Sequence, residues 1–241
     1  MDYVSKELVE FGYYISREEE NDYKKFFEEV PALDTRYYQT GIAYDADECV
    51  QIPSVVYRYE DGQLHLDTLY GKSVHTTVVS ENVQGWNLYN VYRLPTALQS
   101  AVSWKFLSAK CWNLNSVFLK NNSSSLPEGK IFIDFKTDEF SVQITKSNKL
   151  LLAKTFTYSS PGDVLYYLLK ACQQHGLSQE KVNLSLSGLI EKDSGIYREL
   201  YKYFIHLEFE TLSGNIKIGE ALKVHPDHYY SSISKLAACV L

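Results

Sequence analysis

Residues 131–158 read IFIDFKTDEFSVQITKSNKLLLAKTFTY, and this stretch decides the fold. Residues 131–135 are an apolar run, and residues 140–145 then alternate apolar and polar side chains with the period of a strand. Ser147, Asn148 and Lys149 predict a tight turn, and residues 150–158 predict a third strand. We therefore expect an antiparallel meander of three strands.

Helix and strand signals alternate after this meander. Ser159 or Ser160 can cap a helix with Pro161 in its first turn and Gly176 at its end. The pattern then predicts a strand at 182–188, a helix at about 194–204, a strand at 205–209 and a helix at about 226–240. The last helix should dock through one face that carries Tyr229, Tyr230, Ile233, Leu236 and Ala237. The order βββαβαβα, with crossovers onto the first strand, predicts a ribonuclease H-like unit.

Turn-forming residues cluster at 120–129 and separate two patterned regions, so we predict domains at 1–125 and 126–241. The first domain is less regular, and only Gly12–Ile15 could be a remnant of an opening hairpin. Its pattern predicts a helix near 18–29, strands near 50–59, 74–79, 86–94 and 105–110, and helices near 96–102 and from 112. We interpret it as a degenerate ribonuclease H-like lobe with insertions.

Composition excludes several classes of function. A formal net charge of -6 over 241 residues repels phosphate backbones, so no nucleic acid is expected as a partner. No apolar run approaches the ~18 residues of a membrane helix, and the first residues do not form a signal peptide. We expect a cytoplasmic protein without a membrane span. The 4 cysteines form no Cys-x-x-Cys pair, so buried reduced thiols are predicted instead of a zinc site.

The segment from Ile131 to Phe209 resembles an uncharacterised bacterial family, known as a domain of unknown function. Members of that family look like pilus-assembly and cell-division proteins of the actin-like ATPase superfamily. The resemblance extends over roughly residues 50–241 and is strongest after residue 130. It is carried by Ile133-Asp134-Phe135 and by residues 90–95, 163–169, 186–194 and 197–204. It implies an α/β, two-lobed actin-like ATPase fold and no established activity.

The same resemblance gives the candidate nucleotide-binding residues. In actin-like ATPases a hairpin that begins with Asp wraps the phosphates, and the carboxylate holds Mg²⁺ through water. Asp134 has the corresponding place, and Thr137 lies in the turn that follows, which contains two further acids and no glycine. Gly188 lies where the superfamily has an adenosine-binding pair of glycines, but Leu189 replaces the second glycine. A solvated hairpin turn and a strand-to-helix turn explain the same residues, and no partner phosphate hairpin is visible in the first domain.

Other motifs are better explained by structure than by chemistry. Gly71-Lys72-Ser73 imitates the end of a P-loop, but Leu66 replaces its first glycine. Asp45, Asp47 and Glu48 form an acidic turn without the spacing of a calcium loop. Between His225 and His228, helix capping by Asp227 is a simpler explanation than a metal. A nuclease would need an acid where Ser187 stands. We predict no catalytic residue and no metal site.

Two functions remain open, and the third alternative is a structural remnant. The leading hypothesis is a non-catalytic or weakly nucleotide-binding member of the actin-like superfamily that acts as an interaction or assembly scaffold with a protein partner and no cofactor. The alternative is an active Mg-dependent ATPase or phosphotransferase that uses Asp134 with Mg·ATP. The sequence leaves the oligomeric state open.

Overall fold

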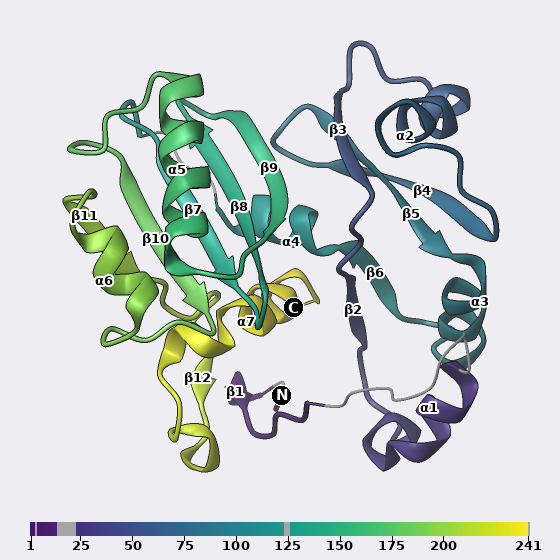
Figure 1. Cartoon of the computed structure of the whole chain (residues 1–241). Coiled ribbons are helices and arrows are strands. Elements are labelled where there is room, and N and C mark those ends of the chain that lie inside the picture. Colours follow the sequence, from purple (N-terminus) through teal and green to yellow (C-terminus); the bar gives the residue numbers. More distant parts are fainter. Residues whose placement is uncertain (3, 14–22, 123–125, 241) are drawn as a thin grey trace. The chain divides into compact units, whose positions relative to one another are not determined.

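The computed structural model describes residues 1–2, 4–13, 23–122 and 126–240 (Figure 1). They form two compact units, which we call the large unit (Met1–Glu10 with Phe118–Cys239) and the small unit (Phe11–Val117 with Val240). The division falls inside helix α4 (Leu114–Asn121), before the turn cluster where the sequence suggested a boundary. Residues 1–10 join the large unit because strand β1 (Glu7–Leu8) pairs in parallel with β12 (Lys217–Ile218).

The large unit is built on a five-stranded sheet of order β11-β10-β7-β8-β9. Strands β7, β8 and β9 form the expected antiparallel meander, and β10 and β11 run parallel to β7 on its other side (Figure 1). The strands are Lys130–Phe135 (β7), Glu139–Lys146 (β8), Lys149–Thr157 (β9), Asn183–Gly188 (β10) and His206–Phe209 (β11). The prediction that the chain crosses over from the meander to pair a later strand with the first one is confirmed, because β10 pairs with β7.

Helices α5 (Pro161–His175) and α6 (Gly195–Tyr201) cover one face of this sheet (Figure 1). Alternate residues of β7 point toward these helices, and Ile131 and Ile133 are fully buried against Val164, Leu168 and other apolar side chains. The opposite face therefore carries the intervening residues of the same strands, which include Asp134.

Helix α5 shows how local signals fix its ends. The Ser160 hydroxyl accepts the Asp163 N–H at 3.3 Å, and the Asp163 carboxylate accepts the Ser160 N–H at 2.9 Å, which completes a capping box. At the other end Gly176 adopts a left-handed conformation with φ 60°. The cap is thus Ser160, and Ser159 only precedes it.

Replacing Ser160 by Ala is expected to lower the free energy of unfolding by about 1 kcal/mol, because an N-terminal N–H loses its acceptor. The matched control is Ser159→Ala, which leaves the hydroxyl of the cap in place. Urea unfolding monitored by circular dichroism measures both variants. Equal losses in the two would contradict the assignment of the cap.

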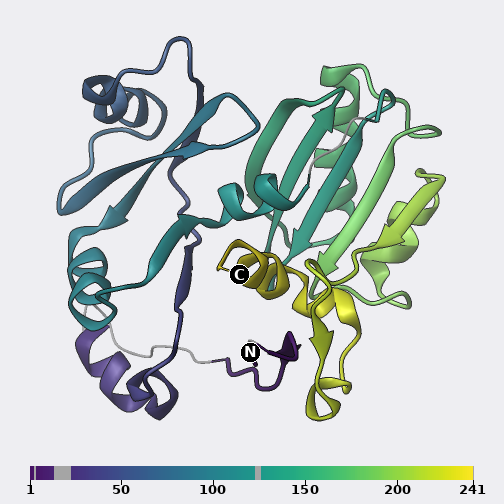
Figure 2. The same ribbon diagram turned by 180° about the vertical axis from the view of Figure 1, so that it is seen from behind.

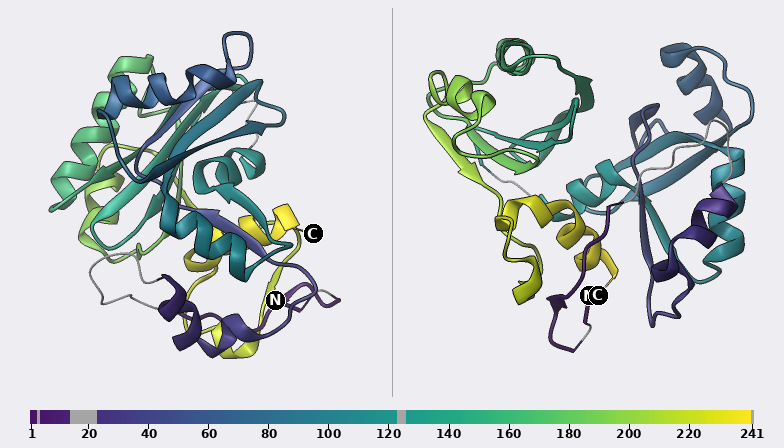
Figure 3. Two further views of the ribbon diagram at one scale, coloured as in Figure 1. Left: turned by 90° about the vertical axis from the view of Figure 1, so that its right-hand side faces the viewer. Right: turned by 60° about the horizontal axis from the view of Figure 1, so that its bottom comes forward.

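The small unit holds a three-stranded antiparallel sheet of order β3-β5-β4 and a parallel pair, β2 with β6. Helix α2 lies across the three-stranded sheet (Figure 3) and buries Leu66 against Ile52 and Val91. The strands are Gly41–Tyr44 (β2), Cys49–Pro53 (β3), Thr76–Val83 (β4), Leu88–Pro95 (β5) and Lys110–Asn113 (β6), and the helices are Tyr23–Glu29 (α1), Gly62–Tyr70 (α2) and Thr96–Lys105 (α3).

Several expectations for this half are wrong. The strand expected at 105–110 is replaced by the end of α3 and a turn, and β6 begins only at Lys110. The strand expected to reach residue 59 ends at Pro53, where Val56 and Tyr57 turn back to bond the Pro53 C=O. Strand β2 and helix α2 were not predicted. Gly12 and Tyr13 form no strand, and residues 14–15 and 18–22 lie outside the described residues.

The remaining expectations were buried reduced cysteines and the absence of a membrane-spanning helix. All four cysteines are free thiols, but only Cys172 is buried and Cys111 is exposed, so the prediction of buried thiols is wrong for Cys111. No helix in the described ranges is long and apolar enough to cross a bilayer.

Candidate functional site

The parallel pairing of β7 with β10 brings two of the three predicted residues together. Ser187 lies opposite Asp134 in this ladder, and Gly188 lies opposite Phe135. Thr137 is exposed in the turn between β7 and β8. The candidate site is therefore the carboxyl end of β7 and β10 in the large unit.

The Asp134 carboxylate is enclosed by hydroxyl groups. Its Oδ1 atom accepts one hydrogen bond from Ser187 Oγ at 2.5 Å and another from Ser232 Oγ at 2.8 Å. Ser187 comes from the neighbouring strand, and Ser232 comes from the C-terminal helix α7 (Ser231–Val240). Only 5% of Asp134 is exposed. The charge is thus held by two donors in a site from which most solvent is excluded.

Gly188 is required by the close approach of two strands. Its φ is 78°, and a Cβ built on it would lie 2.2 Å from the Phe135 carbonyl oxygen. The next residue uses the same oxygen, because the Leu189 N–H donates to it at 2.8 Å. This geometry excludes every residue except glycine at position 188, whether or not a ligand binds.

The turn that carries Thr137 is closed by Tyr158. The Tyr158 hydroxyl donates to the carbonyl oxygens of Lys136 at 2.9 Å and Thr137 at 3.2 Å. Burial raises the pKa of Tyr158, and the charge of Asp138 raises it further. The hydroxyl therefore stays protonated and holds the turn in place without any glycine.

A second cluster on the same face of the sheet was missed by sequence reasoning. Glu210 follows β11 and accepts hydrogen bonds from Lys235 of α7 at 2.6 Å and from Lys130 of β7 at 2.9 Å. The Ser185 hydroxyl also donates to Glu210. The Lys235 ammonium lies 4.9 Å from the centre of the Phe132 ring and is buried to 1% exposure. The cluster attaches α7 to three strands.

Burial and neighbouring charges shift the pKa values of Glu210 and Lys235. Burial alone would raise the pKa of Glu210, but the charge and hydrogen bond of Lys235, with Ser185 and Lys130, lower it to about 2. Burial lowers the pKa of Lys235, and Glu210 and then Asp134 oppose that shift. The charges of both carboxylates therefore stabilise the ammonium form of Lys235.

The expected apolar docking face of the last helix is confirmed for Tyr230, which is buried just before α7, and is wrong for Ile233. The buried residues of α7 are Ser231, Ser234 and Lys235, whereas Ile233 is 36% exposed. The helix packs on a polar face of the sheet, so small hydroxyl residues and one paired lysine make the contact. The small polar residues in the run Ser231-Ser232-Ile233-Ser234-Lys235 could have indicated this polar contact from the sequence.

The histidines near the start of α7 are explained by packing. His228 is buried, and its Nε2 lies 2.7 Å from the Ile190 carbonyl oxygen while its ring stacks on Phe209. His225 stacks on Tyr229 instead. The predicted cap by Asp227 is wrong, because Asp227 is the first residue of a 3-10 helix that has no side-chain cap.

The acidic turn of the small unit also has a structural explanation. Glu48 accepts a hydrogen bond from the buried Arg93 at 2.6 Å, and Arg93 also bonds Asp67 and the Gly71 carbonyl oxygen. Gly71 ends α2 with φ 84°, so its glycine is explained by the helix end and not by a phosphate. Within the described ranges no three His, Cys, Asp or Glu residues gather in a group that could hold a metal ion.

Two solved structures are similar to this chain and show the class of fold. A protein from Bacteroides thetaiotaomicron, described as having an actin-like ATPase fold and unknown function, matches with a TM-score of 0.71 at 18% identity, over 89% of this chain and 79% of the other. The PilM-PilN type IV pilus biogenesis complex matches with a TM-score of 0.50 at 9% identity, over 78% of this chain and 74% of the other. The chain has the actin-like ATPase fold.

The family follows from a match over most of the chain. Residues 4–207 match the model of the family described as Protein of unknown function (DUF3822), and the chain belongs to that family. No curated protein matches the chain. The resemblance predicted from the sequence is confirmed at the level of family and fold.

Proposed function

We propose that this chain is a non-catalytic or weakly nucleotide-binding scaffold, in which the two units are ribonuclease H-like lobes of the actin-like fold. The observation that carries the proposal is the enclosure of Asp134, whose Oδ1 already accepts the hydroxyls of Ser187 and Ser232. In an ATPase of this superfamily, the equivalent carboxylate must be open to the waters of a Mg²⁺ ion.

The cost of opening this carboxylate supports the proposal. A Mg²⁺-bound water that reached Oδ1 would displace a buried hydrogen bond, and a donor left without a partner costs about 1–3 kcal/mol. Ser187 is completely buried, so its hydroxyl would have to turn from Asp134 to the Ile133 carbonyl oxygen, which lies at the longer distance of 3.3 Å. A bound nucleotide would have to supply this free energy before it gained any affinity.

The other two candidate residues give little support to a phosphate site. The absence of a side chain at Gly188 is needed for the close approach to the Phe135 backbone. Leu189, the next residue, has 48% of its surface exposed. The turn around Thr137 presents Asp138, whose negative charge repels phosphate. Asp134, Thr137 and Gly188 remain the residues that would contact nucleotide under the alternative, a Mg-dependent ATPase or phosphotransferase.

The proposed partner is a protein in the cytoplasm. The similar PilM structure is a complex with PilN in type IV pilus biogenesis, so that relative of the fold assembles with another protein. The charge of -6 does not favour nucleic acid as a partner.

Titration with Mg·ATP is expected to leave the melting temperature unchanged up to several millimolar. A ligand that binds only the folded state at 100 times its Kd stabilises that state by about 2.7 kcal/mol, which a thermal-shift measurement detects. Asp134→Asn is the matched variant, because it removes the charge and keeps the shape. A rise in melting temperature that needs Mg²⁺ and disappears in Asp134→Asn would show nucleotide binding at this site and favour the alternative function, which ATP turnover would then test.

A further inference from the structure

The outer edge of β11 has no neighbouring strand in the described part of the chain. Strand β11 ends the sheet order, and Figure 2 shows β10 on one side of it and no strand on the other. The Glu210 N–H donates to the Leu186 carbonyl oxygen at 2.8 Å and so points toward β10. Because successive residues of a strand alternate between its two edges, Leu207 and Phe209 direct their N–H and C=O groups to the open edge.

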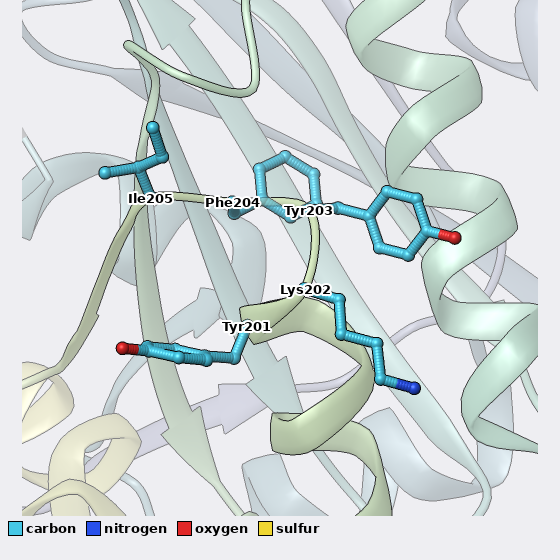
Figure 4. Close-up of a pocket in the computed structure, with 5 residues that line it drawn as sticks. All are labelled: Tyr201, Lys202, Tyr203, Phe204 and Ile205. Atoms are coloured by element: carbon cyan, nitrogen blue, oxygen red, sulfur yellow. The ribbon is translucent and has the colours of Figure 1, made fainter.

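Exposed apolar side chains precede this edge. The exposed fractions are 66% for Tyr201, 49% for Tyr203 and 64% for Ile205. With Lys202 and Phe204 these residues line a hollow of about 240 Å³ (Figure 4). Figure 4 shows Tyr201 and Ile205 pointing to one side of the turn and Tyr203 to the other. Tyrosine is enriched at protein interfaces because it combines a large apolar surface with a polar tip.

The two edges of the sheet differ in charge. Strand β9 at the opposite edge carries exposed Lys149 and Lys154, and lysines on an edge strand discourage pairing with another chain. Strand β11 carries no lysine, and its two exposed residues are His206 and Glu208, which have opposite polarity. Only the β9 edge is thus protected by like charges.

The sequence of β11 is complementary to itself in one antiparallel register. With a two-fold axis at Leu207, His206 lies opposite Glu208 of the second copy, and Ile205 lies opposite Phe209 of the second copy. The imidazole N–H donates to a carboxylate in either protonation state. An axis at Glu208 would place two glutamates opposite each other, which is destabilising. Intermediate registers would set outward N–H groups against residues that face inward.

We propose that β11 pairs in antiparallel fashion with β11 of a second copy of this chain, about a two-fold axis at Leu207. The main-chain groups of Leu207 and Phe209 form the ladder, two His206–Glu208 pairs fix the register, and Ile205 packs on Phe209 of the second copy. The proposal names a partner for the scaffold role proposed above and in that sense rests on it.

Sedimentation velocity of the full chain tests this proposal over a range of concentrations. The wild type is expected to show a reversible monomer–dimer equilibrium. Glu208→Lys removes both His–Glu pairs and should raise the dimer dissociation constant by roughly two- to thirtyfold. The double swap His206→Glu with Glu208→Lys restores opposite charges in the same register and should bring the constant back toward the wild-type value. Glu10→Lys, at an exposed acid elsewhere in the large unit, is the matched control and should have no effect.

Three results would overturn the pairing. The first is a monomer at every soluble concentration. The second is a dimer insensitive to Glu208→Lys, which would place the contact elsewhere. The third is a loss that the double swap does not reverse, which would mean that His206 and Glu208 do not face each other across the dimer. Thermal unfolding of each variant verifies that it folds. None of these results changes the Mg·ATP titration, so failure of the pairing and failure of the scaffold role are distinguishable.

Discussion

Gly188→Ala is expected to lower the free energy of unfolding by about 3 kcal/mol or more. The added Cβ would lie 2.2 Å from the Phe135 carbonyl oxygen and 2.9 Å from its nitrogen, and both belong to the backbone of a central strand. Backbone in a sheet cannot give way as the end of a side chain does, so β7 and β10 must separate. The φ of 78° adds strain of about 1 kcal/mol for any residue with a side chain.

Gly176→Ala separates the two causes. Gly176 has φ 60°, but a Cβ there meets nothing within 4 Å. Its loss should therefore be about 1 kcal/mol, from the backbone conformation alone. Urea unfolding of both variants gives the difference. Similar losses at 188 and 176 would mean that the strands are not in such close contact.

Glu210→Gln is expected to cost about 3–5 kcal/mol, because it leaves the buried Lys235 ammonium without its counter-charge. Lys235→Met should cost less, since the carboxylate that remains still accepts Lys130 at 2.9 Å and the Ser185 hydroxyl. The double variant should cost less than the sum of the two single variants, because neither buried charge is then left without its partner. Chemical unfolding of the four proteins completes the cycle, and additive losses would contradict a direct pair.

The pH dependence of unfolding gives an independent measure of the same pair. The folded-state pKa of Glu210 is about 2, below its ordinary value of 4.5. Its contribution is therefore fully present above pH 4.5 and is lost as the pH falls toward 2. The difference in stability between wild type and Glu210→Gln should shrink over that interval. A difference that stays constant would show that folding does not lower the pKa of this carboxyl group.

Local patterns in the sequence predicted the large unit well. Helix α5 begins directly after Ser160 and ends before Gly176, because the residues of the capping box and the left-handed glycine lie within a few residues of its ends. The turn at Ser147 and Asn148, with φ of 49° and 59°, likewise depends on its own residues. Such elements need no knowledge of distant contacts.

Elements that depend on distant pairing were missed. Strand β2 is paired by β6, which lies far along the chain, and no local period marks either strand. The face of α7 was misjudged because an apolar stripe was expected, whereas Lys235 packs against Phe132 of β7 and Glu210, which follows β11. Partners of this kind reverse the usual preference of lysine for the surface.

Sequence reasoning named the residues of the candidate site but not the groups that surround them in the fold. Asp134 and Gly188 lie on neighbouring strands, as the resemblance implied, but the hydroxyl of Ser232 reaches Asp134 from 98 residues further along the chain. The need for glycine at 188 arises from the backbone of Phe135, which the sequence around Gly188 does not reveal.

The pairing of β1 with β12 has a consequence for the order in which the chain is made. Residues 7–8 are synthesised long before their partners at 217–218. The described strands of the small unit lie between residues 41 and 95 or at 110–113, so they are synthesised before the first strand of the five-stranded sheet. Residues 7–8 must therefore wait for their β12 partners until more than two hundred further residues have been synthesised.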